Sequence, residues 1–249
     1  MSTHQSRLER QFSAVALVVF AFLQLAMVLL ELILAKALPL TLAADFLQKA
    51  KISSVVFYFL VYLVTGAAGF VGVLGLVQVY TQSQRLVGEV ARLTALAYFT
   101  VTYWLWSATW IVQYKITLLT DKPTDPPEWL LRTFAASDSL WSLTSWGGIG
   151  PSILLFTCLG WLLWRGARRL PKTASVLFYA LAVSRFADIV YIGASGTTVR
   201  NVAGYDFAFL NDVFFAGARI LAFVFAGIAL YTEKGVFVRT HRPGRHRES

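Results

Sequence analysis

The residues best suited to chemistry in this sequence are charged side chains that interrupt apolar stretches near its carboxyl end. Arg185 and Asp188 lie within one such stretch, and Arg219 lies within the next. A charged side chain at the centre of a membrane-spanning helix costs at least about 2.5 kcal/mol on insertion scales, so it usually faces the protein interior and has a partner. The spacing therefore predicts a buried polar cluster between two helices.

The helical period and the expected depth of each residue extend this cluster. Tyr191 continues the helix face that carries Arg185 and Asp188. Two antiparallel helices joined by a short loop also place Asp188 and Asp212 at similar depth. An acidic residue near the outer end of the first span and two residues of the fourth element can join them. The predicted ligand-binding residues are therefore Glu31, Asp138, Trp141, Arg185, Asp188, Tyr191, Asn211, Asp212 and Arg219.

Two hypotheses account for this cluster. In the first, it is an outward-facing polar pocket that binds a small cationic or polar ligand, or that passes a proton. Trp104, Trp106, Trp141 and Trp146 would then supply aromatic walls, which attract cations. In the second, Arg185 and Arg219 form salt bridges with the carboxylates and fix the register of helices four to six. Both hypotheses stay open on the sequence alone.

The composition of the 249 residues indicates the elements that must position these side chains. Hydrophobic residues make up 57% of the chain and charged residues 14%, against about 25% charged residues in an average soluble domain. A membrane span needs about 20 mainly apolar residues. The sequence predicts an all-α integral membrane protein, a six-helix bundle in a single domain over residues 1–237. The predicted spans are 13–35, 53–80, 93–118, 149–166, 173–195 and 207–231.

The fourth predicted element is interrupted. The run Gly147-Gly148-Ile149-Gly150-Pro151 lies inside it, and both glycine and proline weaken a helix. The sequence predicts either a separate polar helix over 134–146, interfacial or re-entrant, before the span, or one long helix with a kink. A re-entrant helix would form part of a cavity wall, because irregular backbone at depth needs protein or water to satisfy it.

The distribution of the positively charged residues indicates how the chain is oriented in the membrane. The formal net charge is +9, and the basic residues lie at the ends of apolar segments, which argues against a nucleic-acid partner and leaves membrane lipids as the surroundings. More of the 22 Lys and Arg residues fall on the side of the N-terminus than on the other side, so both termini are expected in the cytoplasm. In a bacterium the membrane would be the cytoplasmic membrane. Residues 238–249 are expected to form a basic disordered tail.

Several chemistries lack the residues that they need. His4, His241 and His246 all lie in the polar tails, so no imidazole is available within a span for haem or zinc, and no cofactor or metal is expected. The single cysteine excludes an intramolecular disulfide. The tetrad 193–196 resembles the GxSG nucleophile motif of rhomboid proteases, but no histidine in a span would activate Ser195. Small residues that end a helix explain this tetrad better.

The second span carries a stripe of glycines at intervals of three, namely Gly66, Gly69, Gly72 and Gly75. Small residues let helix backbones approach closely in lipid. The stripe predicts close packing within the chain, or alternatively contact with another membrane subunit.

Three functions remain open. The one that we expect is non-enzymatic: binding or translocation of a small polar or amphipathic ligand through the polar cluster of helices four to six. The second is an accessory subunit of a larger membrane complex. The third is an intramembrane enzyme that acts on a lipid or isoprenoid, with Asp138, Asp188 or Asp212 as acid or base.

Overall fold

The computed structural model describes the greater part of the chain. The described residues are 3–37, 52–81, 84–105, 107, 128, 132, 147–166, 168–195, 201–202 and 205–232. Side chains are described at 7–29, 60–81, 84–105, 107, 128, 132, 147–166, 168–190 and 214–232. The predicted polar helix 134–146 and the predicted tail 238–249 lie outside these residues.

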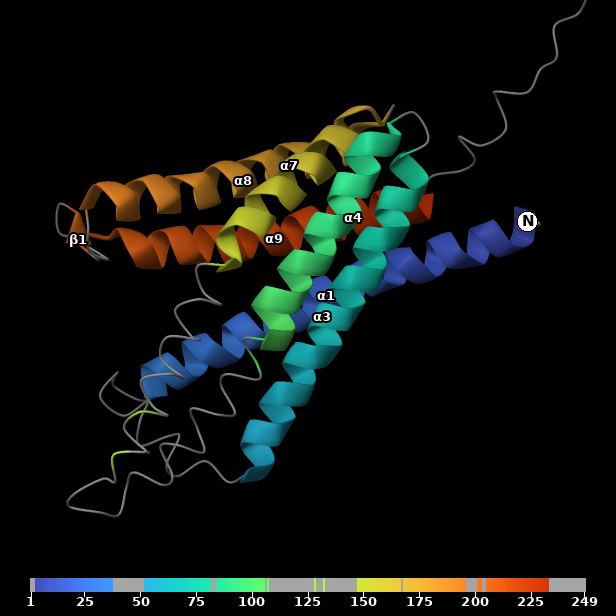
Figure 1. Ribbon diagram of the computed structural model, residues 1–249. Coiled ribbons are helices and arrows are strands. Elements are labelled where there is room, and N and C mark those ends of the chain that lie inside the picture. Colours follow the sequence, from blue (N-terminus) through green and yellow to red (C-terminus); the bar gives the residue numbers. More distant parts are fainter. Residues whose placement is uncertain are drawn as a thin grey trace, which may run out of the picture.

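Helices make up nearly all of the described chain, which confirms the all-α class (Figure 1). They are α1 (Thr3–Ala37), α3 (Ile52–Tyr80), α4 (Arg85–Phe99), α7 (Ile149–Trp164), α8 (Arg169–Ser195) and α9 (Phe207–Thr232). A short π-helix, η2 (Thr100–Leu105), continues α4. Between α8 and α9, a two-residue antiparallel pairing joins β1 (Asn201–Val202) to β2 (Tyr205–Asp206).

The helices form a ring that closes on itself. Each helix packs against the next one in chain order, and α1 also packs against α9. Figure 1 shows α8 and α9 running side by side from the end that carries β1, with α7 beside α8 and α4 beside α3. Because successive helices are antiparallel, one end of the ring carries the start of α1 and the other carries the start of α3, α7 and α9.

The outer surface of the ring is apolar, as expected for a protein in lipid. In the part of the chain that the structure describes, four helical segments are long and apolar enough to cross a membrane, namely Arg7–Leu29, Leu60–Tyr80, Arg169–Val190 and Phe214–Thr232. Large apolar side chains also point away from the core, such as Phe22 at 64% exposed and Val183 at 68% exposed. A helix that is apolar on every side is typical of a membrane span. The chain is therefore an integral membrane protein.

Two helices begin earlier than the sequence predicted. α1 begins at Thr3 rather than near residue 13, and α4 begins at Arg85 rather than near residue 93. The first turns of α4 are polar, with an exposed ion pair of 2.9 Å between Arg92 and Glu89. Hydropathy alone does not reveal a polar extension of this kind. Apart from Ser107, the part of the predicted third span beyond Leu105 lies outside the described residues.

The glycine-proline run marks the start of α7. Gly148 is a turn residue, and its carbonyl accepts a hydrogen bond of 3.1 Å from the amide of Ser152. Pro151 lies in the first turn, where an amide N–H has no partner within its helix, so proline costs little there. α7 has 16 residues and is about 24 Å long, shorter than a hydrocarbon core of about 30 Å.

The glycine stripe of α3 packs against helices of the same chain. A Cβ atom on Gly69 would overlap the rings of Phe20 and Phe99, and one on Gly72 would lie 2.6 Å from Leu17. Gly75 faces Ser13 of α1 in the same way. The prediction of packing within the chain is confirmed for these positions, and the stripe is occupied by α1 and α4.

Six aromatic side chains form a closed layer across the centre of the ring, which we call the aromatic layer. Neighbouring centroids around it are 4.7 to 5.9 Å apart, and each side chain is at most 2% exposed. Each aromatic pair contributes about 0.5–1.5 kcal/mol beyond its area burial. The members are, in order around the layer, Phe99, Phe20, Phe223, Phe178, Phe156 and Tyr98.

Replacing Gly69 by alanine should destabilise the protein, because the new methyl group meets two rings of the aromatic layer. Overpacking of a closed core costs about 1–3 kcal/mol. Gly217→Ala is the matched control, since nothing lies within 4 Å of a Cβ there, and the helix gains about 0.5–1 kcal/mol from losing a glycine. Thermal unfolding in detergent measures both variants. Shifts of equal sign and size would contradict this account of the stripe.

Candidate functional site

A cavity of 260 Å³ lies inside the ring, and every helix of the ring contributes to its wall. The wall combines polar side chains with apolar ones such as Met27, Ile149 and Phe215. Its polar members are Gln24 of α1, Tyr62 of α3, Tyr98 of α4, Thr102 and Tyr103 of η2, Ser152 of α7, Arg185 of α8 and Arg219 of α9.

The cavity occupies one half of the bundle, and the aromatic layer closes it toward the other half. On α1, Gln24 lies in the wall and Phe20 lies one turn nearer the N-terminus. On α9, Arg219 lies in the wall and Phe223 lies one turn further along the antiparallel helix. The layer is therefore the floor of the cavity, and apolar residues such as Ala226 are buried beyond it.

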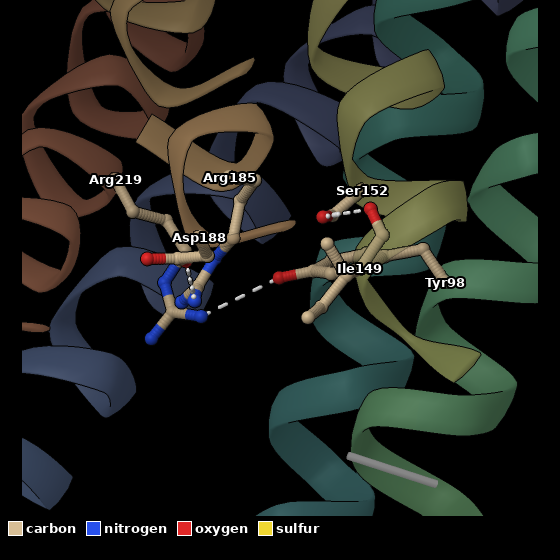
Figure 2. Close-up of polar contacts among 6 residues, drawn as sticks. All are labelled: Tyr98, Ile149, Ser152, Arg185, Asp188 and Arg219. Atoms are coloured by element: carbon tan, nitrogen blue, oxygen red, sulfur yellow. Dashed lines mark hydrogen bonds and ion pairs between the residues drawn. The ribbon is translucent and has the colours of Figure 1, made fainter. Parts of the chain in front are cut away.

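Arg219 is a charged residue in this wall that has no acidic partner among the described residues. One of its Nη atoms donates a hydrogen bond of 3.4 Å to the phenol oxygen of Tyr98 (Figure 2). Its Nε atom is buried and has no acceptor. Among the described residues, no carboxylate lies within 4.0 Å of its guanidinium. A buried donor without an acceptor costs about 1–3 kcal/mol, so Arg219 is held at an energetic cost.

Arg185, by contrast, has its charge matched on its own helix. Its guanidinium forms a hydrogen-bonded ion pair of 2.8 Å with Asp188, one turn further along α8 (Figure 2). Its Cζ atom also lies 3.5 Å from the ring centroid of Phe215, and Cζ of Arg219 lies 5.2 Å from the same centroid. A ring face attracts cations. Phe215 therefore holds both guanidiniums in the same part of the wall.

The π-helix brings two tyrosines together at the floor of the cavity. The backbone of η2 is wound i→i+5, so Tyr103 follows Tyr98 by one turn, with ring centroids 6.0 Å apart. Tyr103 is 2% exposed, and its hydroxyl has no hydrogen-bond partner among the described residues. Short π segments are rare and are often found at functional sites. Here the π segment carries Thr102 and Tyr103 into the wall.

Of the predicted site residues, the structure brings Arg185, Asp188 and Arg219 to one region. Arg185 and Arg219 line the cavity, whereas Asp188 acts on it through Arg185. Four more predicted residues lie on described helices, but their side chains lie outside the described set: Glu31 on α1, Tyr191 on α8, and Asn211 and Asp212 on α9. Asp138 and Trp141 lie outside the described residues altogether.

Sequence reasoning missed the part of the wall that comes from the first three helices. Gln24, Tyr62, Tyr98 and Tyr103 all line the cavity. Gln24 is the clearest signal that was available, because it is a polar residue at the middle of a strongly apolar span. The tyrosines are harder to find, since tyrosine is common at membrane interfaces as well as in cores.

The wall carries positive charge in its described part. Arg185 and Arg219 are its charged members there, and the described lining residues include no carboxylate. The expectation of a cationic or polar ligand stays a prediction, because Asp138 and the side chains of Glu31 and Asp212 lie outside the described set. In the same described residues, no three His, Cys, Asp or Glu side chains gather as a metal site would require.

Asp188→Asn should lower the thermal stability of the purified protein, because Arg185 then keeps its charge without a counterion. The two side chains are 20% and 22% exposed, and we expect a loss of about 1–3 kcal/mol. Glu89→Gln is the matched control: its pair with Arg92 is 51% and 41% exposed, and such surface pairs contribute about 0–1 kcal/mol. Equal losses in the two variants would show that the Arg185 pair is not distinctive.

Comparison of the chain with protein-family models, with curated proteins and with solved structures finds no match.

Proposed function

We propose that this integral membrane protein binds a small polar or amphipathic ligand in the central cavity of its helix ring, and that it is not an enzyme. The observation that carries the proposal is a cavity of 260 Å³ with wall residues from all six helices. Ligand sites commonly lie between the helices of a bundle and combine an apolar wall with a few convergent polar groups. Arg185, Arg219 and the tyrosines are such groups.

The polar groups of the wall support binding more than they support stability. A salt-bridge network that only fixes helix register would match its charges, as Arg185 and Asp188 do at 2.8 Å. Arg219 has no such match among the described residues, and the buried hydroxyl of Tyr103 has no partner there. Groups that lower the stability of the empty protein are expected where a ligand is bound.

We place the mouth of the cavity on the outer side of the membrane, with six crossings and both termini inside. The cavity lies in the half where α3, α7 and α9 begin. At the opposite end, Arg168 donates a hydrogen bond of 2.8 Å to the carbonyl of Thr232, so the connection from α7 to α8 lies beside the end of α9. Arg165 and Arg169 lie at the same connection. A basic end of this kind is typical of the cytoplasmic side.

Translocation would require the floor of the cavity to open. The aromatic layer is fully buried, so a ligand in the cavity is separated from the other side by closely packed rings. A rearrangement of α1 against α9, which meet at Phe20 and Phe223 with centroids 4.7 Å apart, would open the path. Binding alone needs no such movement.

The other two functions have weaker support. As a subunit, the chain would need a surface other than the glycine stripe, which its own helices cover. As an intramembrane enzyme, it would need an acid or base at the cavity, and Asp188 is paired with Arg185. Asp138 and the side chain of Asp212, the other two acids considered for that role, lie outside the described set.

Cysteine accessibility tests the position of the cavity. In a Cys158→Ala background, which removes the chain's one cysteine, Ser152→Cys places a thiol in the cavity wall. We expect a small membrane-impermeant thiol reagent to label it from the side opposite the N-terminus in oriented vesicles. Ala226→Cys, which is buried beyond the aromatic layer, is the control and should not react from either side.

Two outcomes would contradict the proposed position. Labelling of Ser152→Cys only from the side of the N-terminus would place the mouth of the cavity at the end of the ring where α1 begins. Equal labelling of Ser152→Cys and Ala226→Cys would show that the aromatic layer does not close the cavity.

A further inference from the structure

We infer that the ligand of the central cavity is a small organic monoanion with a carboxylate head group. This inference rests on the proposed function and names the class of ligand. It is carried by the charge of the described wall, by its supply of hydrogen-bond donors and by its size.

The charge of the described wall is matched by one negative group. Arg185 is already neutralised by Asp188 at 2.8 Å. Within the described wall the charge of Arg219 is uncompensated, because no carboxylate there forms an ion pair with it. A single negative charge beside Arg219 would make the site neutral, whereas a cation would face two guanidiniums that share the ring of Phe215. Charge balance therefore favours a monoanion.

Two hydrogen-bond donors in this part of the wall, Nε of Arg219 and the hydroxyl of Tyr103, lack acceptors among the described residues. Arginine has donors only, and its Nε atom here has no acceptor. The hydroxyl of Tyr103 is buried in the same wall, and no described residue is its hydrogen-bond partner. The hydroxyl of Tyr98 accepts from Arg219 at 3.4 Å, which leaves its own hydrogen to donate. A carboxylate has two acceptor oxygens in one plane and matches the fork of a guanidinium. Small rotations of these side chains would bring the donors to it.

The remaining wall fits a short apolar body. Met27, Val28, Ile149 and Phe215 line the cavity beside the polar groups. The volume of 260 Å³ lies below the range of about 300–1,000 Å³ that is usual for drug-sized ligands. The ligand is therefore small, and one end of it is apolar.

Titration of the intact, purified protein with three head groups on one six-carbon body tests the inference. The probes are hexanoate, hexanamide and hexylamine, which are negative, neutral and positive at pH 7. We expect hexanoate to bind about tenfold more tightly than hexanamide, because hydrogen bonds between charged groups are roughly twice as strong as neutral ones. Hexylamine should bind most weakly. Isothermal titration calorimetry measures the three affinities.

Removal of the charge of Arg219 should abolish the preference for hexanoate over hexanamide. In Arg219→Gln, we expect the affinity for hexanoate to fall about tenfold and that for hexanamide to stay within about twofold. Arg165→Gln is the matched control, because it removes the same charge from the end of α7, where the guanidinium lies 5.4 Å from the ring centroid of Trp161 and away from the cavity. It should keep the wild-type preference. Arg219→Lys keeps the charge and should retain part of the preference for hexanoate.

Tyr103→Phe provides a second variant, which does not depend on the folding of Arg219→Gln. It removes a buried hydroxyl that has no hydrogen-bond partner in the described part of the chain, so the thermal stability without ligand should stay equal or rise. The affinity for hexanoate should nevertheless fall, because a donor to the carboxylate is lost. An unchanged affinity for hexanoate in both Tyr103→Phe and Arg219→Gln would overturn the inference.

Further titrations show whether the carboxylate comes from a lipid or from a soluble molecule. They also distinguish failure of this inference from failure of the proposed function. Tighter binding of palmitate than of hexanoate would assign the ligand to fatty acids of the bilayer, and the reverse to soluble carboxylates. Tighter binding of chloride or inorganic phosphate than of hexanoate would contradict the inference that the head group of the ligand is a carboxylate. Hexanoate and hexanamide could bind equally well, and both could protect Ser152→Cys from a neutral thiol reagent. That result would contradict the inference that the ligand is an anion, but the proposed function would stand. Binding by none of the probes would overturn both.

Discussion

The contact between Phe20 and Phe223 joins the first helix of the chain to the last, and the rest of the structure depends on that closure. The two rings lie 4.7 Å apart, edge to face. Each then contacts a further ring, Phe99 and Phe178 respectively. Gly69 of α3 makes room for the layer, because a side chain there would overlap two of its rings. Without this closure the helices would form an open array, and no central cavity could exist.

The aromatic layer divides the bundle into two halves with different physical tasks. Beyond the layer, small and apolar residues such as Ala226 and Leu230 are fully buried, and close packing holds the helices together. On the other side, the packing opens into the cavity, and polar groups replace apolar ones. Arg219 lies one turn from Phe223, at the boundary of the halves. The well-packed half thus stabilises a site in which the charge of Arg219 has no counterion among the described side chains.

Much of the fold could be predicted from the sequence, because helices that face lipid must be apolar over their whole length, and such apolar segments are visible in the sequence. The predicted limits of α3 and α9 nearly coincide with the observed helices. The polar first turns of α4 were missed, since Glu89 and Arg92 lower its hydropathy. For the site, the cost of buried charge pointed to Arg185 and Arg219. Gln24 is visible in the sequence as a polar residue within an apolar span, but the closure of α1 on α9 has no local signal there because it is a contact between distant segments.

The central claim is that Arg219 binds the carboxylate of a ligand and not one of the chain's own. The most direct measurement is an experimental density map of the intact protein with hexanoate, at a resolution that shows side chains. The account predicts density for a small molecule between the guanidinium of Arg219 and the hydroxyl of Tyr103. An ion pair between Arg219 and a carboxylate of this chain, such as that of Asp212 or Glu31, with no ligand density in the cavity, would contradict it.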